Sequence, residues 1–187
     1  MKYIKSVLLM AVLVFGVVAM RCEAATIAIV PLVNAVEFNT KGDEQVPNAI
    51  FYNEAMGILK KSLGYALVDN ARLRHAVEEE LTFGKLPTKE QMLKVSKRSK
   101  VDILVAAMLT NYGRKPVQKS VHETNMQMDV KAKVVTYNRL TGKFESRNYV
   151  DDRIYDATLE SRFDLVQESW GRLVRRIFSN IAKVKER

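Results

Sequence analysis

The chain has 187 residues, a formal net charge of +9 and one cysteine. A lone cysteine excludes a disulfide framework, and with only eight glycines and four prolines no low-complexity linker separates one domain from another. The positive charge favours anionic partners, such as phospholipid head groups, acidic cell-wall polymers or the acidic face of another protein.

The first 24 residues have the pattern of a secretory signal peptide. Lys2 and Lys5 precede an apolar stretch over residues 6–20, and Cys22 and Ala24 are small residues two apart. This order predicts export, with cleavage after Ala24.

Two alternatives to a cleaved leader exist. A membrane anchor is disfavoured because a spanning helix needs about 20 apolar residues, more than residues 6–20 provide. Lipidation at Cys22 is disfavoured because a bacterial lipobox has a small residue where Arg21 stands. We therefore expect an exported, unlipidated chain.

Cleavage would leave residues 25–187, which are enough for a single domain with its own core. It removes three basic residues and one acidic residue, leaving 27 basic and 20 acidic residues and a net charge of +7. Nucleic acid would suit this charge, but an exported protein seldom meets it, so no nucleic-acid partner is expected.

Strands and helices alternate at the start of the mature chain. Residues 25–34 are a continuous apolar run, which predicts a strand buried on both faces. Apolar residues at helical spacing over 49–63 predict a helix, with Gly64 placed to end it. Residues 65–68 predict a second strand.

Two further helices follow. Asp69-Asn70 can cap a helix over residues 70–81. Thr88 and Gln91 have capping-box spacing at the start of a helix that runs to Ser99. Residues 101–109 are again apolar throughout and predict a central strand.

The pattern changes after residue 121. Apolar and polar residues alternate over 126–134, which predicts a half-buried strand. Residues 137–143 form a tight turn, and a second strand returns over about 143–155. Pairing Val130 with Val150 keeps apolar faces together, although a bulge at Gly142 would shift that register.

The last element is a long amphipathic helix over about 159–184, marked by one apolar stripe. The order β-α-β-α-α-β followed by β-β-α predicts an α/β fold of the three-layer type. Its mixed sheet has a parallel β-α-β part and an antiparallel β-hairpin, with helices packed on it.

Four segments in sequence resemble one family of bacterial envelope proteins. They are an opening strand "IAIVPLVN", the strand and helix "GYALVDNARLRHAVEEEL", the third strand "SKVDILVAAML" and the hairpin turn "YNRLTGKF". The family comprises the CsgG-like curli-secretion proteins, the penicillin-binding-protein activator LpoB and the TolB amino-terminal domain. The resemblance implies a small α/β fold and an adaptor or assembly role in the envelope.

The chain also departs from that family. LpoB-like and CsgG-like members are usually lipoproteins, which Arg21 argues against here. Pore-forming members carry additional membrane-spanning hairpins, whereas Lys131 and Lys133 lie in the only long hairpin of this chain. The β-propeller that follows the TolB domain is missing, so the resemblance implies neither a channel nor a particular partner.

Nothing in the sequence singles out a reaction. Without cysteine the mature chain cannot perform thiol catalysis, and no metal-binding, phosphate-binding or G-x-S-x-G motif occurs. We expect His75 on a helix surface, and His122 on the surface or at a strand edge. Two acidic clusters, Asp151-Asp152 and residues 78–80, are interpreted as solvated surface, so no cofactor, metal or catalytic residue is predicted.

Charge placement suggests partner-binding residues. Arg72 and Arg74 lie in the first turn of their helix and three glutamates in its last, which opposes the helix dipole. An unfavourable placement of charges that no other contact offsets can mark a surface that binds a partner. The alternative is that an exposed helix simply tolerates these charges. Arg172, Arg175 and Arg176 line the polar side of the last helix and could meet an anionic membrane.

The resulting prediction is a non-enzymatic envelope adaptor or assembly factor. It would act on an envelope protein or on a second copy of itself, through helix faces, the hairpin and open strand edges. The alternatives are a peripheral binder of anionic lipid or wall polymer, and a hydrolase with a dispersed site.

Overall fold

The structure is a computed structural model that describes residues 24–38, 44–61, 65–118, 124–156 and 163–183. The predictions for the leader, Cys22, Gly64 and His122 lie outside these residues.

A mixed sheet of seven strands organises the described residues. The strands are β1 (Ala25–Ile29), β2 (Val33–Asn34), β3 (Tyr65–Leu67), β4 (Ile103–Gln118), β5 (Thr124–Asn138), β6 (Lys143–Asp151) and β7 (Ile154–Asp156). Their order is β3-β1-β4-β5-β6, with β2 also beside β4 and β7 beside β5. Strand β1 runs parallel to β3 and β4, and the β4-β5-β6 pairs are antiparallel. The predicted fold class is confirmed.

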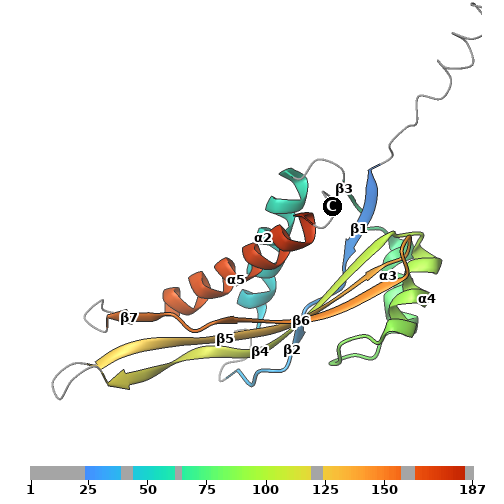
Figure 1. Cartoon of the computed structure of the whole chain (residues 1–187). Coiled ribbons are helices and arrows are strands. Elements are labelled where there is room, and N and C mark those ends of the chain that lie inside the picture. The colour runs from blue at the N-terminus through green and yellow to red at the C-terminus, as the bar shows by residue number, and fades with distance from the viewer. Residues whose placement is uncertain (1–23, 39–43, 62–64, 119–123, 157–162, 184–187) are drawn as a thin grey trace, which may run out of the picture.

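Helices cover both faces of this sheet. They are α2 (Gln45–Lys61), α3 (Ala71–Glu80), α4 (Lys89–Ser99) and α5 (Phe163–Lys183). Helices α2 and α5 lie together on one face, and α3 and α4 lie on the other (Figure 1). The sheet therefore separates two apolar cores.

Strand β1 contributes to both cores, which explains its continuous apolar run. Ile27 belongs to the core under α2 and α5, and its neighbour Ala28 to the core under α3 and α4; both are fully buried. Successive side chains of a strand point to opposite faces, so a strand between two helical layers needs apolar residues at every position.

Both predicted helix caps are confirmed. The Asn70 side chain accepts a hydrogen bond from the Leu73 backbone N–H at 2.9 Å, at the start of α3. At α4, the Thr88 hydroxyl accepts from the Gln91 N–H and the Gln91 side chain accepts from the Thr88 N–H. These contacts satisfy N–H groups that a helix leaves unpaired at its first turn.

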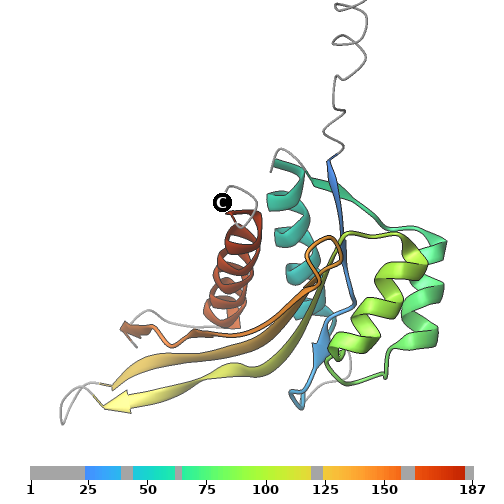
Figure 2. The same ribbon diagram turned by 45° about the vertical axis from the view of Figure 1, so that its right-hand side comes forward.

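Two predicted strands have different lengths in the structure. The run over 25–34 breaks between β1 and β2, and the strand expected to end at residue 109 continues as β4 to Gln118. The extension Thr110–Gln118 is polar and contains Pro116, so it lacks a strand-like pattern. Its partner β5 pairs with it along almost its whole length, and the hairpin projects beyond the helices as an arm (Figure 2).

The sequence left the register of the β5-β6 hairpin open, and the structure shifts it by one residue from the pairing of Val130 with Val150. Val130 pairs with Asp151, and Val150 pairs with Lys131. Four residues form the turn between Asn138 and Lys143, where the Asn138 side chain accepts from the Leu140 and Thr141 N–H groups. A one-residue shift exchanges the two faces of a strand, so Asp151 is 6% exposed and Val150 is 39% exposed.

Candidate interaction surfaces

Asp151 lies at the centre of a buried polar network, contrary to the prediction of a solvated residue. Its carboxylate accepts a hydrogen bond from the Ser169 hydroxyl at 2.9 Å and pairs with Arg172 at 3.4 Å. Arg172 also donates to the Tyr155 hydroxyl and pairs with Glu168. Because β6, β7 and α5 each supply a member, the network fixes α5 on the sheet.

The other two arginines of α5 also contact the fold. Arg175 forms an ion pair with Glu54 of α2. Arg176 donates to the Val150 carbonyl oxygen, and its guanidinium lies 5.9 Å from the centre of the Tyr149 ring. The arginines proposed for membrane contact therefore join α5 to α2 and to β6, although Arg175 and Arg176 remain exposed.

Both arginines of α3 and two of its three glutamates have partners within the fold. The Arg72 side chain donates to the Arg98 carbonyl oxygen near the end of α4, and Arg98 in turn pairs with Glu79 and Glu80. Arg74 pairs with Asp69, which precedes the helix, at 3.1 Å. Helix α4 thus supplies the compensation that the α3 sequence alone lacks.

A crevice opens beside Arg74, where β1 and β3 end. Its volume is about 430 Å³, and its lining includes Pro31, Tyr52, Asp69 and Glu78. Burial raises the pKa of the Tyr52 hydroxyl, and the nearby Asp69 carboxylate raises it further. The chain leaves β1 toward α2 and β3 toward α3, on opposite faces of the sheet, an arrangement that creates ligand crevices in α/β proteins.

No described helix covers the outer face of the projecting arm. We call it the arm face; it points away from α5 and comprises Lys131, Lys133, Asn148, Val150 and Ile154. Val150 and Ile154 are 39% and 55% exposed, although both are large apolar residues. The sequence did not indicate this surface, because it depends on the hairpin register.

The histidine and the acidic clusters considered in the sequence analysis can be placed in the structure where it describes them. His75 lies on the surface of α3, as predicted, with its Nδ1 atom 3.3 Å from Glu79. No group of three or more His, Cys, Asp or Glu in the described part of the chain could hold a metal ion. None of the helices there is both long and apolar enough to span a membrane.

No protein-family model matches the chain, and no curated protein matches its sequence. Solved structures do resemble it. The hypothetical protein CT253 from Chlamydia trachomatis aligns with a TM-score of 0.53 and 14% identity, over 85% of this chain and 96% of that one. At such low identity the likeness shows a shared fold alone.

Two weaker likenesses are to a lipoprotein and to LpoB. Lipoprotein GNA1162 from Neisseria meningitidis has a TM-score of 0.44 and 17% identity, over 85% of this chain and 99% of that one. The LpoB C-terminal domain from Escherichia coli has a TM-score of 0.37 and 12% identity, over 70% of this chain and 84% of that one. The LpoB C-terminal domain, which the sequence resemblance included, is thus among the solved structures to which this chain is similar.

Proposed function

We propose that the chain is an exported, non-enzymatic accessory or assembly factor of the cell envelope, acting through protein-protein contacts. The arm face carries this proposal. It combines two exposed apolar residues, Val150 and Ile154, with the exposed Lys133, while the partly buried Lys131 pairs with Asp129 at 2.7 Å. Apolar anchors surrounded by charge suit a protein partner whose own surface is acidic.

The edges of the arm favour β6 as the strand that a partner would extend. Beyond Asn111, the open edge of β4 contains Pro116, and proline discourages strand pairing there because it has no backbone N–H to donate. The edge of β6 contains no proline. A strand from an envelope protein or from a second copy of the chain would therefore add to β6.

Site-specific photocrosslinking in intact cells tests the arm face. A photoreactive amino acid replaces Asn148, an exposed residue of this face, and in a matched control it replaces Asn53, an exposed residue of α2. We expect one defined envelope protein, or a dimer of the chain, to be captured at position 148 and not at 53. Equal products at both positions, or none at 148, would contradict the proposal.

Arg74 on α3 is a second proposed contact, tested separately. Its side chain is 67% exposed and its only ion pair in the described chain is with Asp69, so Arg74→Glu should reduce partner capture with little change in stability. Arg72 is unsuitable for this test because it also holds the end of α4.

Export is part of the proposal and has its own measurement. Mass spectrometry of the protein isolated from its native cells should find a chain that begins at Ala25 and carries no lipid. A chain that still begins at Met1, or a lipid on Cys22, would contradict it.

A further inference from the structure

A groove lies on the α5 side of the sheet, beyond the C-terminal end of that helix. Helix α5 ends at Lys183, while β5 and β6 continue to their turn (Figure 1). The groove has a volume of about 380 Å³ and is lined by Ile181 of α5, Tyr65 of β3 and residues of β5 and β6. It is separate from the arm face, which lies on the other side of the sheet.

Apolar side chains form most of the groove wall. Ile103 and Val134 lie on its sheet side, and Tyr149 and Ile181 lie toward α5. Leu140 in the β5-β6 turn also lines the groove and is 66% exposed. Such a lining binds a hydrocarbon chain through the hydrophobic effect.

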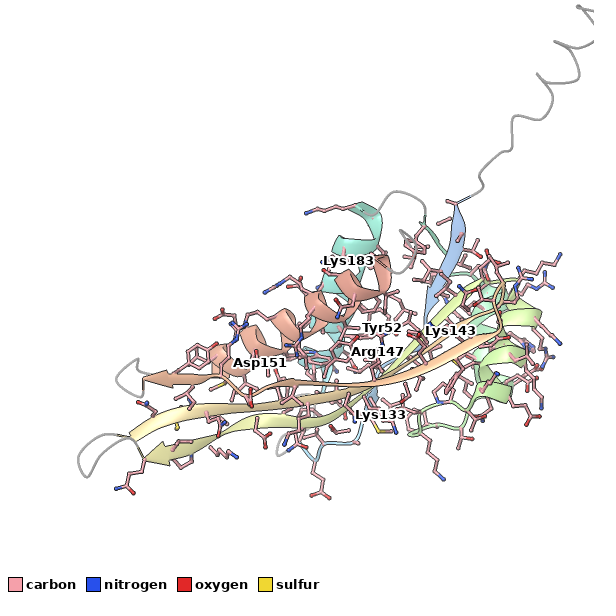
Figure 3. The ribbon with its side chains drawn as sticks, viewed as in Figure 1. Tyr52, Lys133, Lys143, Arg147, Asp151 and Lys183 are labelled. Atoms are coloured by element: carbon pink, nitrogen blue, oxygen red, sulfur yellow. The ribbon has the colours of Figure 1, made fainter. Side chains whose placement is uncertain are left out.

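Two cations stand on the groove side of β6. Lys143 and Arg147 are on the same face of the sheet as Val134, with side chains 64% and 53% exposed (Figure 3). Both pair with the single carboxylate of Glu145. A hydrogen bond from Lys143 is the main cause that holds the pKa of Glu145 below its usual value, and Arg147 adds to it. These three groups therefore leave one net positive charge.

Thr136, Asn180 and Arg147 add hydrogen-bond donors to the groove lining. The Thr136 hydroxyl and the Asn180 amide line it, and neither side chain forms a hydrogen bond to another described residue. Arg147 uses one of its two terminal nitrogens on Glu145, and a guanidinium has five N–H donors in all. The polar part of the groove can therefore donate hydrogen bonds to a ligand that accepts them.

We propose that this groove binds a single-chain anionic amphiphile, a fatty-acid carboxylate of about twelve carbons. The carboxylate would lie at Arg147 and Lys143, and the chain would lie along Val134 and Ile181. A chain of about twelve carbons is the choice to be tested, because a groove of about 380 Å³ lies at the small end of the range for small-molecule sites.

Binding of laurate to the protein purified from cells tests the proposal. A fluorescent probe, 11-(dansylamino)undecanoic acid, should bind with one site per chain and be displaced by laurate. Dodecyltrimethylammonium, which has a cationic head on the same chain length, should not compete. The variant Lys143→Gln/Arg147→Gln should weaken laurate binding by about tenfold or more, since a charge-assisted contact is lost.

Lys133→Gln provides the matched control. Lys133 is next to Val134 in β5 but lies on the opposite face of the sheet, so this variant should bind laurate unchanged (Figure 3). A second variant, Ile181→Glu, places a negative charge in the wall and should abolish binding. Circular dichroism must show that each variant is folded.

Three results would overturn the proposal. Absence of saturable laurate binding is the first. Equal loss in the Lys133→Gln variant is the second, because binding would then follow net charge alone. The third is binding that appears only after residues 184–187 are deleted, because it would assign the groove to the chain's own C-terminus.

Discussion

Asp151 is a carboxylate with 7% side-chain exposure between two cations, Arg172 at 3.4 Å and Arg153 at 3.5 Å. It also accepts a hydrogen bond from the hydroxyl of Ser169, a residue that is itself fully buried. A buried charge requires such partners, because transfer from water without them is costly. Asp151 therefore contributes to the attachment of α5 to the sheet.

Asp151→Ala should lower the free energy of unfolding by about 2 kcal/mol, because it leaves Ser169 and Arg172 without their acceptor. Urea denaturation measures the change. Asp152→Ala is the matched control: its side chain is exposed, so its effect should be below about 0.5 kcal/mol. The double variant Asp151→Ala/Arg172→Leu should lose less than the sum of the two single variants, since both members of the Asp151–Arg172 pair are removed together. Simple additivity would contradict the network.

The Asp151 case shows why part of the surface could not be predicted. Helix caps and apolar strands depend on neighbours in sequence, so Asn70, Thr88 and the two-sided burial of β1 were predictable. The environment of Asp151 depends on a turn one residue longer than the suggested pairing allows, and the alternation of β6 was too weak to decide. Likewise, the α3 charges were paired by Arg98, a residue of another helix that no local pattern connects to them.

At the scale of elements, β1, β4 and β5 are joined at one seam by Asp102. Its carboxylate accepts from the Thr26 N–H at 3.0 Å and the Thr26 hydroxyl at 2.8 Å, and it pairs with Arg139. Its own N–H donates to the Thr26 carbonyl oxygen, and its carbonyl oxygen accepts from the Arg139 N–H. The aspartate of "SKVDILV" therefore has a structural role: it aligns the starts of two parallel strands with the end of the hairpin.

Burial acts to raise the pKa of Asp102, but hydrogen bonds from Thr26 and Arg139 outweigh it and hold the pKa below 3.8. A carboxylate whose pKa is lower in the folded than in the unfolded protein stabilises the fold at pH values above its unfolded-state pKa. This contribution is lost as the pH falls through its folded-state pKa. Asp102→Asn should therefore cost about 1–2 kcal/mol at pH 7, because the amide nitrogen cannot accept from Arg139. The difference from the unchanged protein should narrow below about pH 4.

Urea denaturation at a series of pH values measures this difference. Asp129 and Glu145 also have lowered pKa values, but both proteins contain them, so they cancel in the comparison. Asp152→Asn should show no pH-dependent difference. A cost for Asp102→Asn that persists unchanged to pH 3 would show that its charge is not responsible.

On the scale of the whole molecule, the two apolar cores share their strands. Val105 and Ala107 of β4 face the core under α2 and α5, and Leu104 and Ala106 face the core under α3 and α4. Loss of either helical layer would expose one face of the same central strands to water. The two layers are therefore expected to unfold together, as small two-state domains do.

Trp170 makes this testable, because it is the only tryptophan and reports on one layer. It is fully buried, its indole N–H donates to the Pro47 carbonyl oxygen at 2.9 Å, and it stacks on Phe51. Ala76→Gly changes the other layer, where Ala76 is buried in α3, and should cost about 1 kcal/mol through helix propensity. Urea denaturation should move to lower concentration by the same amount when followed by Trp170 fluorescence and by far-ultraviolet circular dichroism.

Lys97→Gln is the control, because Lys97 is on the exposed side of α4. It should change neither the fluorescence transition nor the circular dichroism transition. If Ala76→Gly shifts the circular dichroism transition while the Trp170 transition stays where it was, the layers unfold separately. The helices α3 and α4 would then be able to open while α5 remains docked. Equal shifts with an unchanged denaturant slope would instead show one cooperative unit, in which a contact made at α3 alters the stability of the face that carries α5.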